Sequence, residues 1–306
     1  MIDAVRTQTG SRPELAALPV NEPIGYIGSK VLPVMKVSGK AGTYYYSTLV
    51  AASAAQTGRS AGAAPTAETL AESSSTFSAA ERIDRAKLPW EMIPLIGGLN
   101  KADERGAKVA LRNVKDALET AQLAVLIDGA GTSITSALVD GMIDACDQVH
   151  RYSGKTAFVC DIGQYRWLIQ QTEIKNLLVR TFGGLGAMEA MSLNKTTFKL
   201  MLQAIFAVDD VLIADDLFWP YTYRTTAAIV KIPDMADEIS FVSDPEYGRT
   251  MIYWPTDSET PYEINSFPDD DLRSNIFDAV EWDSIEQFNS GAKVLLTINT
   301  SGSTTV

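Results

Sequence analysis

LNKADERGAKVALRNVKDALETAQLAVLID, residues 99–128, is the segment from which the organisation of the rest of the chain follows. Asn100 is a good N-cap, Asp103 and Glu104 fall in the first turn, where the helix dipole favours negative charge, and Gly129 is a stop signal. Apolar residues recur at steps of three and four and predict one buried face: Ala107, Ala110, Leu111, Val114, Leu118, Ala121 and Val125. Charged residues fall mostly off that line: Lys108, Arg112, Lys115, Asp116 and Glu119. The segment therefore predicts one amphipathic helix roughly 40 Å long at 1.5 Å per residue. An ordinary long helix in an enzyme core has the same pattern, so the flanking sequence has to decide.

The composition indicates a globular chain. Its 306 residues, 46% of them hydrophobic, suffice for one large domain or two to three modest ones with a real core. No apolar run is long enough to cross a membrane and the N-terminus lacks the apolar centre of a signal peptide, so we expect a soluble protein that is not exported. Cys146 and Cys160 form no CxxC pair and no ligand cluster with His150, which favours buried reduced thiols over a disulfide.

The net charge of -12 is unevenly distributed. Residues 1–128 carry a net charge of +1, whereas residues 129–306 carry -13. An acidic protein repels nucleic acid at long range, which argues against sequence-specific recognition of DNA or RNA. Loose contact through the near-neutral first part stays open.

The first ninety residues contain few side chains that can anchor a core. Residues 1–40 are punctuated by Pro13, Pro19, Pro23 and Pro33 and predict an extended arm with one short helix near residues 24–31, which either wraps its own domain or reaches a neighbour. Residues 43–50 and 73–87 predict the two strands of a hairpin, and the small, polar residues 51–67 predict a long tip that becomes ordered against another subunit. A disordered linker is the alternative for that tip. Trp90, in LPWEMIP, is predicted to be buried.

The remaining elements indicate an α+β protein. Helices are predicted at residues 133–152, 162–178 and 194–207, with strands at residues 155–160 and 210–214 between them. After Pro220 the pattern is mostly sheet, with strands predicted at residues 227–232, 238–242, 250–254, 279–282 and 292–298.

No strong signal of an active site emerges, and we predict no catalytic, cofactor-binding or metal-binding residue. Gly39-Lys40 and Gly154-Lys155-Thr156 lack the earlier glycine of a P-loop, and the dinucleotide fingerprint is incomplete at Gly183, Gly184 and Gly186. Two groups of carboxylates are better explained as solvated turns than as a cation site or an acid/base pair: Asp209, Asp210, Asp215 and Asp216, and Asp269, Asp270 and Asp271. With one histidine and no GxSxG motif, a nucleophilic triad has no support, so the chain is not expected to be an enzyme.

The order of these parts resembles the major capsid proteins of tailed bacteriophages, the fold named for phage Hong Kong ninety-seven. The resemblance covers almost the whole chain and is carried by three segments: IGSKVLPVMKVSGKAGTYYY (27–46), FKLMLQAIFAVDDVLIADDLFWPYTYRTTAAIVKIPD (198–234) and DSIEQFNSGAKVLLTIN (283–299). It implies an N-terminal arm (1–40), an extended E-loop hairpin (41–90), a peripheral P-domain with the spine helix (91–131 and about 241–285) and a mixed α/β axial A-domain (about 132–240 and 286–306).

The function implied is that of a shell subunit. Such proteins form hexamers and pentamers of an icosahedral shell around double-stranded DNA, assemble in the host cytoplasm and become part of the virion. Partners implied are other copies of the chain, a portal protein and a decoration protein, with no cofactor and no membrane. No long helical segment precedes the arm, which favours a separate scaffolding protein. The tip contains Arg59 but no lysine, which excludes the lysine cross-link of some relatives.

The residues expected at the interface between subunits lie in the hairpin and just after it. Tyr44, Tyr45 and Tyr46 are expected to supply strand contacts, and Arg82, Arg85 and Lys87 to pair with acidic groups of a neighbour. Arg59 and Trp90 complete the set. We also expect the arm and the long helix to face the genome with a near-neutral lining that avoids gripping DNA, and the acidic later region to face outward.

Two other functions stay open at this point. An encapsulin-like compartment would have the same architecture around a protein cargo. A soluble α/β enzyme would be a monomer or small oligomer with a ligand-filled cleft.

Overall fold

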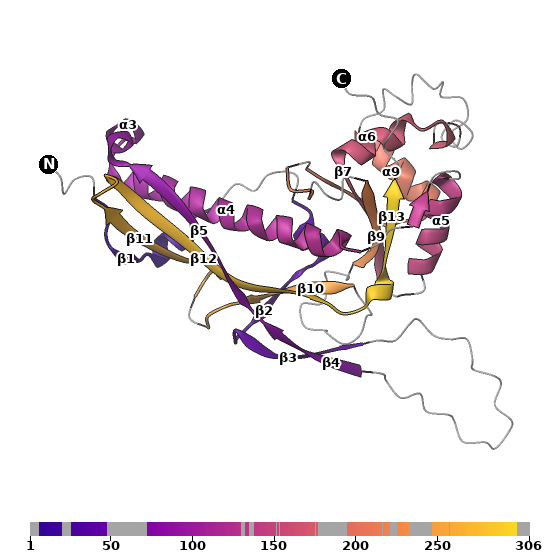
Figure 1. The fold of residues 1–306 in the computed structure, drawn as a ribbon, viewed down its shortest axis with the longest axis horizontal. Coiled ribbons are helices and arrows are strands. Elements are labelled where there is room, and N and C mark those ends of the chain that lie inside the picture. Colours follow the sequence, from indigo (N-terminus) through magenta and orange to yellow (C-terminus); the bar gives the residue numbers. More distant parts are fainter. Residues whose placement is uncertain are drawn as a thin grey trace, which may run out of the picture.

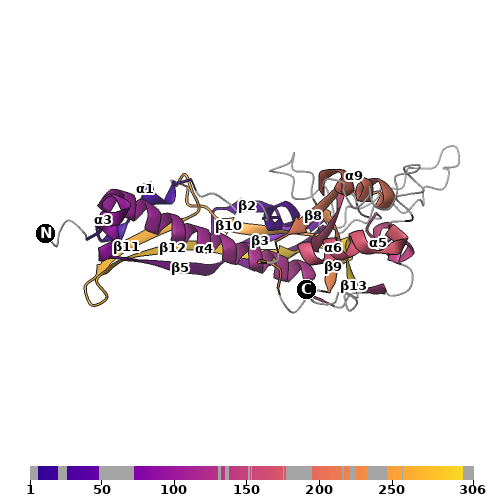
Figure 2. The ribbon, with the colours of Figure 1, turned by 90° about the horizontal axis from the view of Figure 1, so that it is seen from above.

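A computed structural model describes residues 6–19, 26–47, 72–129, 132–134, 138–150, 152, 154–174, 176, 195–215, 217–220, 225–232, 247–256 and 258–298. The molecule is elongated, with one sheet along the helix α4 (Leu99–Ile127) and a second sheet at the end of that helix (Figures 1 and 2). The helices α5 (Leu138–Val149), α6 (Ile162–Gln170) and α9 (Lys195–Phe206) cover the second sheet. A separate two-stranded hairpin, β3 (Ala41–Ser47) and β4 (Glu72–Ser78), projects beside the first sheet (Figure 1). This mixture of helices and sheets confirms the predicted α+β class.

The long helix is α4, Leu99–Ile127, and it confirms the predicted strut. Its start differs from the prediction, because the helix begins before Asn100 and its N-cap is Gly98. Gly97 and Gly98 both have positive φ, 99° and 108°, which lets the chain turn sharply out of the short helix α3, Ile93–Ile96.

The buried face of α4 follows the prediction for its first five residues and then shifts. Ala121 and Val125 are only half-buried, and the buried residues near the end are Gln122, Leu123, Leu126 and Ile127. The reason is that α4 contacts two different cores. Its first half packs on the strands β5 (Ala80–Pro89) and β12 (Ser274–Gln287) through Ala107, Ala110, Leu111 and Val114. Its last turns pack into the core of the second sheet.

The first sheet has the order β1-β11-β12-β10-β2, with β5 along the other edge of β12. These strands are Gly10–Ser11, Glu263–Asp269, Ser274–Gln287, Gly248–Tyr253, Val34–Val37 and Ala80–Pro89. All pairs are antiparallel except β10 with β2. The 14-residue β12 is far longer than the strand predicted at residues 279–282, and β11, which contains Pro268, was not predicted.

The second sheet has the order β6-β13-β9-β7-β8. Its strands are Thr132–Ile134, Lys293–Ile298, Thr226–Ile232, Lys155–Asp161 and Asp210–Ala214. One face packs against α5 (Leu138–Val149), α6 (Ile162–Gln170) and α9 (Lys195–Phe206), and the other against the end of α4 and the helix α2, Gly28–Val31. Because both faces are covered, every residue of β9 is buried.

These elements confirm most of the predicted helices and strands of residues 133–298. The helix α6 ends at Gln170, short of the predicted residue 178, because Gln171 is extended. The strand predicted at residues 238–242 and the hairpin tip, residues 51–67, lie outside the described residues. Cys146 and Cys160 are buried reduced thiols, as predicted, and burial raises the pKa of Cys146 to about 12. Among the described helices, none has an apolar stretch long enough to cross a bilayer.

The hairpin is confirmed in its first strand and corrected in its second. β3, Ala41–Ser47, pairs with β4, Glu72–Ser78, and the Ala79 N–H closes the base of the hairpin on the carbonyl of Lys40 at 2.7 Å. The return strand predicted at residues 73–87 is interrupted at Ala79. The second part of that segment is β5, which belongs to the first sheet instead.

The described part of the N-terminal arm lies on its own chain. β1 pairs with β11, and α1, Pro13–Ala16, packs against α4. The predicted short helix is present as α2, and β2 extends the first sheet beside β10. Of the two possibilities raised by the sequence, the described segments take the first and wrap their own body.

The contact between α4 and β12 allows a first prediction, at Gly106. A Cβ atom there would lie 2.4 Å from two ring carbons of Phe277, which is fully buried in β12. We expect Gly106→Ala to lower the free energy of unfolding by about 1–3 kcal/mol, measured by urea unfolding, because overpacking outweighs the better helix propensity of alanine. Val109→Ala, on the exposed side of the same helix, is the control and should change it by less than about 0.5 kcal/mol. A Gly106→Ala protein as stable as the parent would contradict this packing.

Candidate assembly interface

The base of the hairpin is anchored by aromatic side chains on one face of β3. Alternation along the strand puts Tyr44 and Tyr46 on the same side. The ring of Phe288 lies 5.1 Å from that of Tyr44 and 5.5 Å from that of Tyr46, measured between centroids, and the Tyr46 ring stacks on it. The Tyr44 hydroxyl donates a hydrogen bond of 3.1 Å to Glu286, and burial raises the pKa of Tyr44. Tyr44 is thus an anchor within its own chain.

Phe77 of β4 completes this anchor from the other strand. It forms a buried cluster with Tyr44, Met251 and Phe288. Its ring lies directly over Gly42, where a Cβ atom would be 2.9 Å away, so only glycine at position 42 lets the ring approach. The hairpin therefore leaves the body from a fixed base.

Tyr45 points to the opposite side from the anchor and is 57% exposed. It borders an apolar pocket of about 320 Å³ between the hairpin and the first sheet. The other lining residues are Met35, Val37, Thr43, Tyr44, Phe77 and Met251. An exposed tyrosine beside an apolar hollow is the kind of surface that protein partners cover.

Arg82 and Arg85 pair with acidic residues of their own chain. Arg82 donates two hydrogen bonds to Asp283, at 2.8 and 2.9 Å, and a third to the carbonyl of Ala117 in α4. Arg85 likewise donates two hydrogen bonds to Asp278, at 2.7 and 2.8 Å. Because the Arg85 side chain is 58% exposed, this bidentate pair adds little stability. The acidic partners expected from a neighbouring subunit are therefore supplied by β12.

Two of the other residues predicted at the interface, Lys87 and Trp90, lie in β5 and directly after it. Lys87 is exposed, whereas Trp90 is half-buried rather than buried, and its indole N–H donates to Asn275 at 2.9 Å. Arg59 lies outside the described residues. As contacts between subunits, these residues and the tyrosines stay a prediction.

Three of the four carboxylates weighed as a cation site accept hydrogen bonds from backbone N–H groups, and the fourth, Asp216, lies outside the described residues. The Asp209 carboxylate accepts from the Thr156 N–H at 2.7 Å, and Asp210 and Asp215 accept from N–H groups one and two residues further on. No group of three metal-ligating side chains occurs within the ranges that the structure describes.

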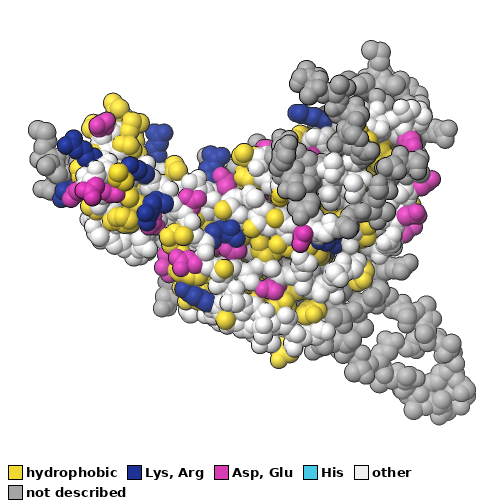
Figure 3. All heavy atoms as spheres, in the orientation of Figure 1, with side chains coloured by type: hydrophobic (Ala, Val, Ile, Leu, Met, Phe, Trp, Pro, Cys, Tyr) yellow, Lys and Arg dark blue, Asp and Glu magenta, His cyan; other side chains and the backbone are white. Residues whose placement is uncertain are grey.

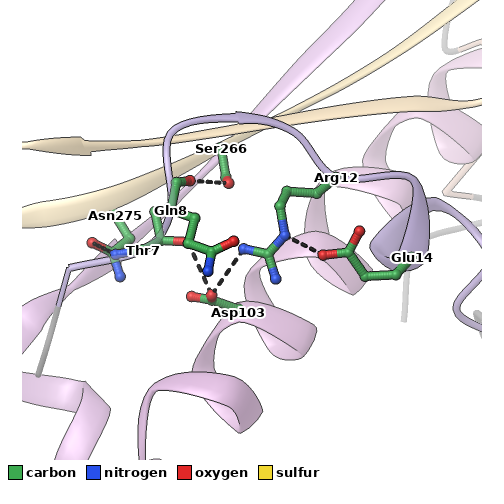
Figure 4. Close-up of polar contacts among 7 residues, drawn as sticks. All are labelled: Thr7, Gln8, Arg12, Glu14, Asp103, Ser266 and Asn275. Carbon is green, nitrogen blue, oxygen red and sulfur yellow. Dashed lines mark hydrogen bonds and ion pairs between the residues drawn. The ribbon is translucent and has the colours of Figure 1, made fainter.

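A polar cluster attaches the N-terminal segment to the start of α4 (Figure 4). The Thr7 hydroxyl donates to Asp103 at 2.9 Å, and Arg12 lies 3.4 Å from the same carboxylate oxygen and also contacts Glu14. The Ser266 hydroxyl donates to the carbonyl of Gln8 at 2.7 Å. Asp103 is only 4% exposed, and burial raises its pKa against the opposing effect of Thr7 and Arg12.

Sequence reasoning missed several residues of these two sites. Phe77, Met251 and Phe288 belong to segments far apart in the chain, and nothing in their local pattern links them. Asp103 was assigned only to the helix dipole, although it also receives Thr7. Glu119 was assigned to the solvent-exposed face of α4 but is only 3% exposed. It accepts hydrogen bonds from the backbone N–H groups of Ile27 and Gly28, at the start of α2, at 2.7 and 2.9 Å.

Glu281, in β12 beside the Arg82–Asp283 pair, is the most strongly perturbed acid described. It is fully buried, and neither carboxylate oxygen has a hydrogen-bond partner among the described residues. Burial, with a smaller contribution from Asp283, raises its pKa from 4.5 to about 8. As pH rises, the Glu281 carboxyl group loses its proton in the unfolded chain at a lower pH than in the folded protein. Glu281 therefore stabilises the fold fully below about pH 4.5, and this contribution is lost as pH rises towards 8.

We expect Glu281→Gln to remove this pH dependence, because the amide stays neutral. The difference in the free energy of unfolding, variant minus parent, should rise by on the order of 2–3 kcal/mol when the pH is raised from 5 to 7.5. This figure follows from about 1.36 kcal/mol per pKa unit. Urea unfolding at the two pH values measures it. Glu263→Gln, at an exposed position of β11, is the control and should leave the pH profile unchanged. Identical pH profiles for Glu281→Gln and the parent would show that Glu281 is ionised in the folded protein.

Known proteins resemble this chain in structure. No protein-family model and no curated sequence matches the chain. Solved structures do match. A phage-related protein from Bordetella bronchiseptica aligns over 95% of this chain and 98% of its own, with a TM-score of 0.62 and 15% sequence identity. The capsid of cyanophage P-SCSP1u aligns over 92% and 90%, with a TM-score of 0.53 and 13% identity.

A third solved structure, the mature capsid of bacteriophage PhiM1, aligns over 93% of this chain and 89% of its own, with a TM-score of 0.52 and 12% identity. The alignments extend over nearly the whole length on both sides. At such low identity, they establish a shared fold and leave the function to be argued from the molecule.

Proposed function

Because this chain has the fold of tailed-bacteriophage capsid proteins, we propose that it is a major capsid protein: a structural subunit that forms hexamers and pentamers of an icosahedral shell around double-stranded DNA. The observation that carries the proposal is the agreement with solved capsids over more than nine-tenths of the chain. The body of this chain is elongated and so suited to lie side by side with copies of itself (Figure 1).

The hairpin supplies a physical reason for self-assembly. A two-stranded sheet is marginally stable alone and presents unpaired N–H and C=O groups along its edges. Within the described chain, β3 and β4 pair only with each other, and their base is held by the aromatic anchor. A neighbouring subunit that covers Tyr45 and the adjacent pocket would bury this surface, as β-strand addition does in other assemblies.

The proposal divides the chain as the resemblance implies. Residues 1–40 form the arm, 41–90 the E-loop, 91–131 with about 241–285 the P-domain, and about 132–240 with 286–306 the A-domain. The partners we propose are a separate scaffolding protein, a portal protein and a decoration protein. We further propose assembly in the host cytoplasm, residence in the virion, and no enzymatic activity.

The wild-type protein provides the direct test. We expect the purified chain to form large particles of uniform size by light scattering, and particles from infected cells to protect double-stranded DNA from nuclease. A monomer or small oligomer under all conditions would point to a soluble enzyme instead. Particles that contain protein cargo and no protected nucleic acid would point to an encapsulin-like compartment.

Tyr45 offers a sharper test of the hairpin. Tyr45→Ser removes an exposed ring, so the subunit should keep its free energy of unfolding within about 0.5 kcal/mol, while the yield of particles falls severalfold. Tyr45→Phe keeps the ring and should assemble as the parent does. Light scattering and urea unfolding on the same samples separate the two effects. Full assembly by Tyr45→Ser would remove this face of the hairpin from the interface.

A further inference from the structure

A groove lined by positive charge runs along the exposed side of α4. It has a volume of about 460 Å³ and lies between the helix and Pro19. The lining residues from α4 are Lys101, Glu104, Arg105, Lys108, Val109 and Arg112. Dark blue side chains recur over the half of the molecule that contains α3 and α4 (Figure 3). We call this hollow the α4 groove.

The cations of the α4 groove form a single line. Lys101, Arg105, Lys108 and Arg112 follow one another at steps of four, three and four residues. An α-helix turns by about 100° and rises by about 1.5 Å per residue. The four side chains therefore lie in one sector about 60° wide and span about 16 Å along the helix axis. A periodic partner with regularly spaced negative charge can meet all four at once.

Three of these cations have no acidic partner in the described chain, although the protein as a whole carries 38 acidic residues against 26 basic ones. The described ion pairs leave out Lys101, Arg105 and Lys108, and only Arg112 approaches a carboxylate, that of Asp116 at 3.7 Å. By contrast, Arg12, Arg82 and Arg85 are paired at shorter distances or with two hydrogen bonds. Among the described residues, the α4 groove is thus a positive surface with most of its cations outside any ion pair.

We propose that the α4 groove binds the phosphate backbone of double-stranded DNA. This inference rests on the proposed function, in which such DNA is the polyanion enclosed by the shell. A row of phosphates provides closely spaced charge with no demand for sequence, and arginine and lysine are the side chains that contact it. This inference departs from the expectation of a near-neutral lining, because the net charge of +1 over residues 1–128 conceals this local line of cations.

An acidic protein segment is the competing occupant, and the lining of the α4 groove disfavours it. Protein partners take most of their affinity from apolar or aromatic anchors in a desolvated pocket. The apolar lining here consists of Pro19 and of Val109, which is 45% exposed, and neither forms such a pocket. Contact in this groove is mainly electrostatic, as at a DNA backbone.

The test compares two variants with equal loss of charge. Lys101→Gln/Arg105→Gln removes two exposed cations of the α4 groove, and Lys30→Gln/Arg166→Gln removes two exposed cations elsewhere. Binding of full-length subunits to a fluorescent 20-base-pair duplex is followed by anisotropy between 50 and 200 mM NaCl. Each phosphate contact contributes about 0.9 to the magnitude of the slope of log K against log salt concentration. The magnitude of this slope should therefore fall by about 2 in the groove variant and by less than about 0.5 in the control variant.

Equal losses in the two variants, or no duplex binding by the parent at 50 mM NaCl, would overturn the proposal. Tighter binding of polyglutamate than of the duplex would overturn it in favour of an acidic protein partner. Particle formation by light scattering keeps the result separate from the proposed function. If shells form and protect DNA but the groove variant binds DNA as the parent does, only the groove proposal is refuted. If DNA binding depends on the groove but the subunits never form shells, the proposed shell function is refuted.

Discussion

The close packing of one continuous helix against two separate cores is the contact on which the rest of this structure depends. The first half of α4 lies on β5 and β12, where Gly106 admits the ring of Phe277, and its last turns fill the core under the second sheet with Leu123, Leu126 and Ile127. A helix of 29 residues is about 43 Å long, more than one small core can cover. Because the same helix is part of both cores, the two sheets keep a fixed position along it, and the molecule is elongated (Figure 2).

Buried acidic side chains mark the places where other segments join this helix. Near the start of α4, Asp103 accepts a hydrogen bond from the Thr7 hydroxyl. Nearer its end, Glu119 accepts hydrogen bonds from the backbone N–H groups of Ile27 and Gly28. A buried carboxylate needs donors, and both sets of donors come from the N-terminal segment. Glu281 is different, because neither of its oxygens finds a described donor, so neutrality is the cheaper state for it. The N-terminal segment is therefore attached to its own body by specific polar contacts as well as by β1 and β2.

Much of this fold follows from local sequence patterns, and the resemblance to capsid proteins is confirmed at the level of the fold. The three-to-four spacing in residues 99–128 predicted α4, and runs such as residues 155–160 and 210–214 predicted β7 and β8, because both signals depend only on neighbours in the chain. The break at Ala79 had no such signal, since β5 is assigned to a different sheet by pairing with β12, almost 200 residues away. Arg82 and Arg85 were recognised as pairing residues, but the same distant strand supplies their partners.

The connection between the hairpin and β5 has a mechanical consequence. Only Ala79 separates β4 from β5, and β5 is held to β12 by ten register pairs and by the two-pronged contacts of Arg82 and Arg85. A pull on the hairpin directed along β5 therefore loads this ladder in shear, so that its hydrogen bonds share the force instead of opening one after another. The hairpin can therefore transmit tension to the body of the molecule without first separating β5 from β12.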